Sequence, residues 1–202
     1  MDLDFIEIGT SDFDTLLESS INERGISIEP VQVYLNRLPH RKNTIKVCKG
    51  ISDKCVNDAI IYYIPPHVIE ALRLPNWLKG CNSFFEEHLR HSSYEEYVVC
   101  DCVDIIRFVD IINEFEVNKL KKLKLDCEGH DLTILDSIYD QYMKRFLTVL
   151  PEEIYFECYT GEEKKPPYRR KKELESTVLN FNSLDYVLEK EKGYNYTLRR
   201  LL

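Results

Sequence analysis

The chain has 202 residues and a formal net charge of −8, and 44% of its residues are hydrophobic. This length is typical of one domain that buries about 70% of the surface exposed by its unfolded chain, and the negative charge disfavours binding to nucleic acid or anionic membranes. No segment approaches the roughly 20 apolar residues of a membrane span, and the seven cysteines lack paired Cys-x-x-Cys spacing, which disfavours zinc and indicates free thiols in the cytoplasm.

The N-terminal segment predicts a strand, a tight turn and a helix. Residues 5–8 form a short apolar run that ends at Gly9. We expect Ser11 to cap an amphipathic helix, with Asp14 three residues later as in a capping box. The inward face of that helix would contain Phe13, Leu16, Leu17 and Ile21.

An acid follows the next predicted strand. That strand covers residues 26–29, and Glu29 lies 20 residues after Gly9. A strand, a glycine turn, a helix and a second strand ending in an acid are typical of units that bind the ribose hydroxyls of a nucleoside. The pattern therefore predicts a cofactor that contains adenosine.

The residues around Gly9 favour S-adenosylmethionine (SAM) over a dinucleotide. A pyrophosphate at a helix N-terminus requires further glycines and no competing anions, whereas this loop has one glycine and the acids Asp12 and Asp14. SAM has no phosphate and carries a sulfonium and an ammonium group that acids attract. Glu7, an acid inside an apolar strand, adds to this charge. The predicted cofactor-binding residues are Glu7, Gly9, Thr10, Ser11, Asp12, Phe13, Glu29, Pro30, Gly50, Ile51, Ser52 and Asp101.

The rest of the chain alternates predicted helices and strands. In order we expect a helix over 31–38, strands over 44–49, 59–64 and 97–102, a helix over 103–113, a strand over 120–127, a helix over 131–146, a strand over 153–159, a mostly helical stretch over 169–189 and a strand over 194–201. Residues 65–93 have weak periodicity, as in an insertion or lid, which we place at about 59–95. The alternation predicts a single α/β domain with a mostly parallel sheet, helices on both faces and ligands outside the carboxyl ends of the strands.

Polar residues gather where the predicted strands end. Asp126, Glu128 and His130 alternate as one strand runs out, Glu157 closes the next, and Asp101 closes an earlier one. Buried carboxylates are costly unless they are paired, hydrogen-bonded or functional. We therefore expect these side chains to meet at one edge of the sheet and to carry the chemistry.

These motifs resemble the FkbM family of SAM-dependent O-methyltransferases. The resemblance rests on segments 5–9 (Phe-Ile-Glu-Ile-Gly), 28–30 (Ile-Glu-Pro), 124–135 (Lys-Leu-Asp-Cys-Glu-Gly-His-Asp-Leu-x-x-Leu), 154–157 (Ile-Tyr-Phe-Glu) and 192–194 (Lys-Gly-Tyr). It spans the chain and departs from the family at residues 10–12, where Thr-Ser-Asp replaces small residues and glycine. It implies a Rossmann-like methyltransferase sheet with an antiparallel C-terminal strand.

The resemblance also implies methyl transfer from SAM to a hydroxyl oxygen, aided by a general base. Such a base contributes roughly 10²–10⁴-fold. His130 is one candidate, because the ordinary pKa of histidine lies near neutrality, and Asp126 is the other, because it lies at the strand end beside the cofactor. Glu128 would orient the base or cap the next helix. A variant with Mg²⁺ on Asp126, Glu157 and Asp101 ranks below this metal-free mechanism.

The expected acceptor is a sugar hydroxyl of a glycan, with a deoxyhexose such as rhamnose preferred. Trp77, Glu157 and Tyr159 are the predicted substrate-binding residues, with Tyr168, Arg169 and Arg170 nearby. A lipid or polyketide hydroxyl, a non-catalytic SAM-fold binding module and a nicotinamide-dependent reductase are the alternatives. Domains of this kind occur beside glycosyltransferase domains in glycan-building proteins, including those of large algal viruses, so we expect the chain to be part of a longer protein.

Overall fold

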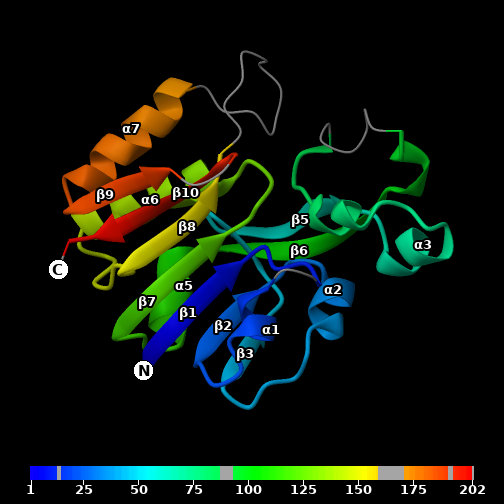
Figure 1. Ribbon diagram of the computed structural model, residues 1–202, viewed down its shortest axis with the longest axis horizontal. Coiled ribbons are helices and arrows are strands. Elements are labelled where there is room, and N and C mark those ends of the chain that lie inside the picture. The colour runs from blue at the N-terminus through cyan, green and yellow to red at the C-terminus, as the bar shows by residue number, and fades with distance from the viewer. Residues whose placement is uncertain (13–14, 87–92, 159–170, 191–192, 202) are drawn as a thin grey trace.

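A computed structural model describes residues 1–12, 15–86, 93–158, 171–190 and 193–201 (Figure 1). Seven strands form the main sheet, in the order β3-β2-β1-β7-β8-β10-β9. Their bounds are β1 (Asp2–Ile8), β2 (Gly25–Ile28), β3 (Thr44–Val47), β7 (Lys119–Leu125), β8 (Glu153–Glu157), β9 (Tyr186–Lys190) and β10 (Asn195–Arg200). The first five strands in that order are parallel, and β10 is antiparallel to both neighbours. The predicted sheet is therefore confirmed, including its antiparallel C-terminal strand.

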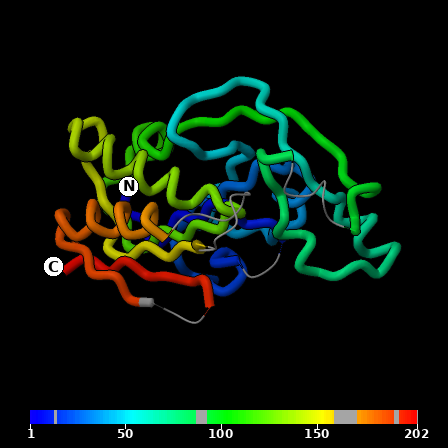
Figure 2. The backbone as a smooth tube through the Cα atoms, turned by 90° about the horizontal axis from the view of Figure 1, so that it is seen from above, coloured from blue at the N-terminus to red at the C-terminus, as the bar shows by residue number. Residues whose placement is uncertain are grey.

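Helices cover both faces of the main sheet. One face carries α5 (Phe108–Glu114), α6 (Asp131–Met143) and α7 (Lys171–Asn182), and the other carries α1 (Leu16–Ser19) and α2 (Gln32–Arg37). The residues of β1 alternate between the two sides. Ile6 and Ile8 belong to the large core with α5 and α6, whereas Phe5 packs with residues of α1 and α2. Figure 2 shows α5 and α6 on one side of the central strands and α1 on the other.

A second, three-stranded sheet beside the main one was not predicted. It has the order β4-β6-β5, with β4 (Gly50–Ser52), β5 (Val56–Tyr63) and β6 (Val99–Arg107). The helix predicted over 103–113 begins only at Phe108, because residues 103–107 continue β6. Val103 pairs with Ala59 of β5 and Ile105 pairs with Gly50 of β4. Two partner strands and β-branched side chains favour the strand here over a helix.

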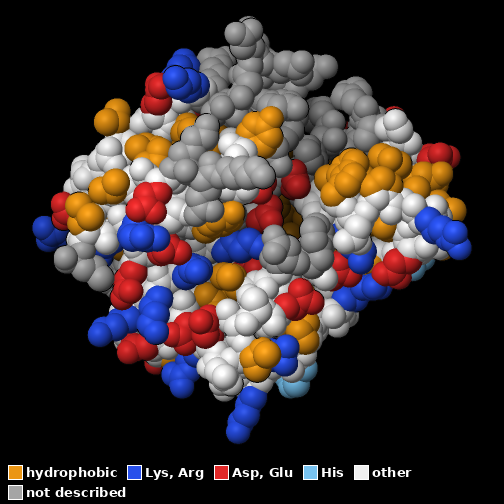
Figure 3. Space-filling model, in the orientation of Figure 1, with side chains coloured by type: hydrophobic (Ala, Val, Ile, Leu, Met, Phe, Trp, Pro, Cys, Tyr) orange, Lys and Arg blue, Asp and Glu red, His pale blue; other side chains and the backbone are white. Residues whose placement is uncertain are grey.

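The insertion extends from this second sheet. It contains α3 (Pro66–Ala71) and the short 3₁₀ helices η1 (Asn76–Gly80) and η2 (Glu95–Tyr97). Figure 1 shows these elements beyond the ends of β5 and β6, and Figure 3 shows hydrophobic side chains gathered over the same part of the surface. No helix in the part of the chain that the structure describes is long and apolar enough to cross a membrane.

The first helix differs from its prediction. It starts at Leu16, and Thr15 caps it by accepting a hydrogen bond from the Glu18 N–H at 3.1 Å. The predicted cap, Ser11, instead lies in a turn with a φ of 52°. Ile21, expected on the inward face, is 61% exposed. Phe13 and Asp14 lie outside the described residues.

Two C-terminal boundaries also differ from their predictions. Helix α6 ends at Met143, and Phe146, expected to point inward, is 65% exposed. The stretch predicted as mostly helical over 169–189 divides into α7 and the edge strand β9.

Candidate active site

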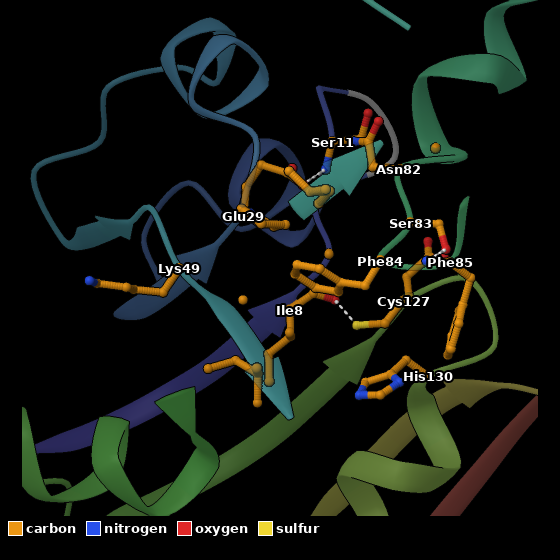
Figure 4. Close-up of a pocket in the computed structure, with 17 residues that line it drawn as sticks. Ile8, Ser11, Glu29, Lys49, Asn82, Ser83, Phe84, Phe85, Cys127 and His130 are labelled. Atoms are coloured by element: carbon orange, nitrogen blue, oxygen red, sulfur yellow. Dashed lines mark hydrogen bonds between the residues drawn. The ribbon is translucent and has the colours of Figure 1, made fainter. Parts of the chain in front are cut away.

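A pocket opens at the carboxyl ends of β1, β2 and β7, as Figure 4 shows. The empty volume of the pocket is about 530 Å³, and this value includes space that is open to solvent. Besides the main sheet, residues of the second sheet and of segment 80–85 of the insertion line it. The lining residues are Ile8, Gly9, Ser11, Glu29, Pro30, Lys49, Gly50, Ile51, Ile61, Gly80, Asn82, Ser83, Phe84, Phe85, Asp126, Cys127 and His130.

The pocket collects eight of the residues predicted from the sequence. These are Gly9, Ser11, Glu29, Pro30, Gly50, Ile51, Asp126 and His130. The predicted residues that do not line it are Glu7, Thr10, Asp12, Ser52, Trp77, Asp101, Glu128 and Glu157. The other predicted residues, Phe13, Tyr159, Tyr168, Arg169 and Arg170, lie outside the described part of the chain.

Gly9 forms the turn between β1 and the loop at the pocket floor. Its φ is +79°, and a Cβ atom placed on it would lie 2.0 Å from the Asp126 carbonyl oxygen. The Asp126 N–H in turn donates to the Ile8 carbonyl oxygen at 3.0 Å. The backbones after β1 and β7 therefore approach so closely that only glycine fits.

Glu29 is buried at the end of β2, where it faces the pocket. Its Oε2 accepts a hydrogen bond from the Ser11 N–H at 2.7 Å, and its Oε1 accepts one from the Val31 N–H at 2.8 Å. Burial raises the pKa of this carboxyl to about 7, although the hydrogen bonds from Val31, Ser11 and the Asn82 side chain oppose the shift. The acid predicted to bind ribose hydroxyls thus also shapes the loop after β1.

Glu7 is fully buried and holds the chain beneath the pocket. Its Oε1 accepts from the Leu16 N–H at 2.7 Å and lies 3.5 Å from Lys124 Nζ. Burial raises its pKa, and the charge of Lys124 opposes that rise. The contacts with α1 and β7 thus engage Oε1, while Oε2 is buried without a hydrogen-bond partner among the described residues.

Asp12 was expected to present negative charge at the start of a helix, and this expectation is wrong. Its side chain is 4% exposed, and its Oδ2 lies 2.7 Å from Arg37 Nε and 3.3 Å from Lys79 Nζ. Both cations also contact Glu70. Ser11 Oγ donates to the Lys79 carbonyl oxygen at 2.7 Å, so the loop after β1 is fastened to η1 of the insertion.

Acids do meet at the ends of β7 and β8, as predicted. Asp131, the first residue of α6, joins the two strands, because its carboxylate accepts from the Cys127 and Glu157 N–H groups, each at 2.9 Å. Burial raises the pKa of Asp131 to about 7. The pKa of Asp126 is raised well above its ordinary value by burial and by the charges of Asp131 and Glu157.

Asp101 does not belong to this cluster. It is exposed within β6, opposite Ile61, because β6 continues to Arg107 instead of ending near residue 101. Its Oδ1 accepts from the Cys102 N–H at 2.8 Å. Among the described residues, no group of three or more histidine, cysteine, aspartate or glutamate side chains is placed to hold a metal ion.

His130 lies at the N-cap position of α6, which Glu128 was expected to cap. Its Nε2 lies 2.8 Å from Ser52 Oγ, at the end of β4. The ring centroid of Phe85 is 6.0 Å from that of the imidazole. Ser52 was predicted to line an adenine site, and its hydroxyl contacts the histidine in this structure.

The insertion supplies one wall of the pocket. Backbone hydrogen bonds of 2.9 and 3.0 Å between Tyr62 and Ser83 hold it against β5. The ring of Phe84 lies over Gly50, since a Cβ atom on this glycine would meet Phe84 Cζ at 2.6 Å. Asn82 hydrogen-bonds Glu29, and its Oδ1 is buried without a partner among the described residues.

Trp77 lies away from this wall. It is 56% exposed and packs edge-on against Tyr94, with ring centroids 6.1 Å apart. The sequence feature that could have identified this wall is the aromatic pair Phe84-Phe85, both of which line the pocket.

The fold is similar to that of the crystal structure of the methyltransferase FkbM from Methylobacillus flagellatus KT, with a TM-score of 0.52 and 12% sequence identity. The match covers 98% of this chain and 44% of that chain, so this chain spans less than half the length of that FkbM protein. At this identity the similarity shows the fold, which is that of a methyltransferase. A scan against protein-family models and a search of curated proteins gave no match.

Proposed function

We propose that this chain is a SAM-dependent methyltransferase of the FkbM type that methylates a sugar hydroxyl of a glycan. The observation that carries the proposal is the pairing of the Gly9 turn with buried Glu29 in one pocket wall, at the carboxyl ends of parallel strands. In open α/β sheets, ligands bind at that edge. The methyltransferase fold supports the same reading.

The residues of the pocket fit the nucleoside half of SAM. Glu29 has two carboxylate oxygens that accept hydrogen bonds, and the buried Asn82 Oδ1 is a further acceptor without a partner among the described residues. These acceptors suit ribose hydroxyls and an adenine amino group. Lys49, the lysine in the lining, is paired with Asp104 at 2.7 Å, which disfavours a pyrophosphate and hence a dinucleotide.

Each part of the pocket then has a role in binding. Glu29 and Asn82 would accept from the ribose or base, the Gly50–Ile51 backbone and the Phe84 ring would contact adenine, and the loop from Gly9 to Ser11 would hold the methionine part. When bound, SAM supplies an electrophilic methyl group to an oxygen nucleophile.

His130 is the better candidate for the base. Burial raises the pKa of Asp126 well above its ordinary value, and the protonated form that this favours donates a hydrogen bond instead of accepting a proton. The imidazole of His130 lines the same pocket and has a nitrogen to receive a proton. Asp126 would then donate a hydrogen bond to the acceptor or to the methionine part.

A sugar acceptor suits the aromatic side of the pocket. Phe85 lies beside His130, and sugar rings pack their apolar faces on aromatic side chains while polar groups take the hydroxyls. The methyl group of a deoxyhexose such as rhamnose would add apolar contact there. Tyr159, Glu157 and Trp77 remain proposed acceptor-binding residues, and neighbouring glycosyltransferase domains of a longer chain remain proposed partners.

Isothermal titration with SAM, S-adenosylhomocysteine and NAD tests the cofactor. We expect binding of the first two and none of NAD. Glu29→Gln, with folding checked by circular dichroism, should weaken SAM binding by about 1–3 kcal/mol, the usual cost of losing a charged hydrogen-bond partner. The exposed Glu18→Gln serves as the matched control. NAD binding, or unchanged SAM affinity in Glu29→Gln, would contradict the assignment.

Methyl transfer is tested separately with labelled SAM and a panel of oligosaccharides, phenols and lipids. We expect label in the sugars. Label only in phenols or lipids would overturn the acceptor class and keep the cofactor. SAM binding without transfer to any member of the panel would favour a non-catalytic SAM-binding module.

A further inference from the structure

Ser52 connects an exposed carboxylate to the histidine of the pocket. Its Oγ lies 2.8 Å from Asp53 Oδ1 and 2.8 Å from His130 Nε2. An ionised carboxylate only accepts hydrogen bonds, so the hydroxyl proton of Ser52 points to Asp53. The Ser52 oxygen is then the acceptor toward the imidazole. The proton of that second bond therefore belongs to Nε2 of His130.

We propose that Ser52 and Asp53 are positioning residues, which hold His130 in the tautomer that carries its proton on Nε2. A neutral imidazole with its proton on Nε2 has its lone pair on Nδ1. Nδ1, which is buried in this structure, is thus the atom that would have to accept the proton of the acceptor hydroxyl. This inference rests on the proposed function, in which His130 is the base.

The proton transfer balances within the proposed reaction. The bond between acceptor oxygen and methyl carbon forms, the bond between sulfur and that carbon breaks with its electron pair left on sulfur, and the hydroxyl proton moves to Nδ1. The imidazolium that results donates from both nitrogens, so the bond from Nε2 to Ser52 persists. The carboxylate of Asp53 then stabilises the positive charge of the imidazolium indirectly, through the Ser52 hydroxyl.

The fold holds this chain of hydrogen bonds in place. Ser52 is 6% exposed and is fixed by the pairing of β4 with β6, in which it lies opposite Arg107. The ring of Phe85 is tilted by 57° against the imidazole. Ser52 was predicted to contact adenine, and its contact with His130 gives it a different task.

Nuclear magnetic resonance of the protein labelled with ¹⁵N in its histidine rings tests the tautomer directly. The chain has five histidines, and the signal lost in His130→Asn identifies the one of interest. At a pH where the ring is neutral, we expect His130 protonated on Nε2, with a ring N–H proton that exchanges slowly with water. Ser52→Ala should lose the slow exchange and Ser52→Thr should keep it. A wild-type His130 protonated on Nδ1 would overturn the inference.

Turnover with labelled SAM and methyl α-L-rhamnopyranoside tests the consequence. We expect Ser52→Ala to lower kcat roughly tenfold, as part of the ~10²–10⁴-fold that a positioned base supplies, with the KM for SAM unchanged and activity restored in Ser52→Thr. The exposed Ser19→Ala is the matched control. Wild-type kcat in Ser52→Ala would overturn the positioning role. A protein with the expected tautomer that transfers no methyl group would contradict the proposed function and leave the hydrogen-bond chain standing.

Discussion

The contact between Phe84 and Gly50 predicts that Gly50→Ala destabilises the wild-type protein but not a protein in which Phe84 is replaced by alanine. A Cβ atom at position 50 would lie 2.6 Å from Phe84 Cζ and 3.1 Å from Ile105 Cγ1, whereas ordinary contacts are 3.4–4 Å. The ring must therefore retreat by about 1 Å or leave its packing against the cluster that contains Tyr34 and Ile61. Such overpacking typically costs about 1–3 kcal/mol.

The same substitution should be harmless once the ring is gone. The backbone of Gly50 is not in the left-handed region, so alanine fits its conformation. Replacing glycine by alanine at a compatible position stabilises by about 0.4–1 kcal/mol, because the unfolded chain has fewer states to lose. In a Phe84→Ala background the Ile105 contact at 3.1 Å still opposes this gain. We expect Gly50→Ala to be neutral or stabilising there and destabilising by about 1–2 kcal/mol alone.

Urea unfolding of the four proteins measures this coupling as a double-mutant cycle. A second cycle with Phe85→Ala serves as control, because Phe85 packs against His130 and is not among the atoms nearest to Gly50. Additive effects in the Phe84 cycle, or equal coupling in both cycles, would refute the reasoning. The cycle reports where the insertion lies over β4 and needs no ligand, so it is independent of the proposed cofactor.

Three further predictions concern the buried groups of the pocket. Gly9→Ala should destabilise the fold by more than the roughly 1–2 kcal/mol of a left-handed residue, because its Cβ would lie 2.0 Å from the Asp126 carbonyl oxygen, and thermal unfolding checks this. The pKa of Glu29 is raised to about 7, so the folded protein keeps a proton that the unfolded chain loses near pH 4.5. This group should therefore lower the free energy of unfolding by about 3 kcal/mol as the pH rises from 4 to 8. In Glu29→Gln the urea midpoint should depend less on pH. Ribose hydroxyls would favour the ionised form of Glu29, so SAM affinity should rise with pH through about 7, which titration in buffers of different ionisation enthalpy would show as proton release.

The sheet was predictable because its signals are local. Apolar runs of strand length alternate with helical periods along most of the chain, and Gly9 and Glu29 follow the strands that deliver them to the pocket. The second sheet was missed because β4 has three residues and gains its identity from β6, more than 40 residues away. Residues 103–107 have a pattern that a helix shares, and only the partner strands decide between the two.

Site residues could be predicted from the sequence where they lie at the end of a strand. They could not be predicted where their contacts are made by residues far away in the sequence. Asp12 was expected to meet the cofactor, but its charge is taken by Arg37 and Lys79, which lie 25 and 67 residues further along the chain. Ser52 was predicted to line the adenine site, and its hydroxyl contact with His130, 78 residues away, has no signal in the local sequence. Asn82 had no local pattern that marked it as a wall residue, and the signal for Phe84 was the aromatic pair that it forms with Phe85 in the predicted insertion.

Two carboxyl groups at the edge of the sheet where β7 and β8 end have raised pKa values, so they are more often protonated than ordinary aspartates. Asp126 and Asp131 both have raised pKa values, first because both are buried; the charges of Asp131 and Glu157 add to the rise at Asp126, and those of Glu157 and Glu128 add to the rise at Asp131. Near neutral pH the edge therefore carries less charge than its formal count of acids. Burial therefore favours carboxyls that donate hydrogen bonds and a histidine that accepts the proton. The sequence showed only that acids lie at the strand ends and did not show that they are buried.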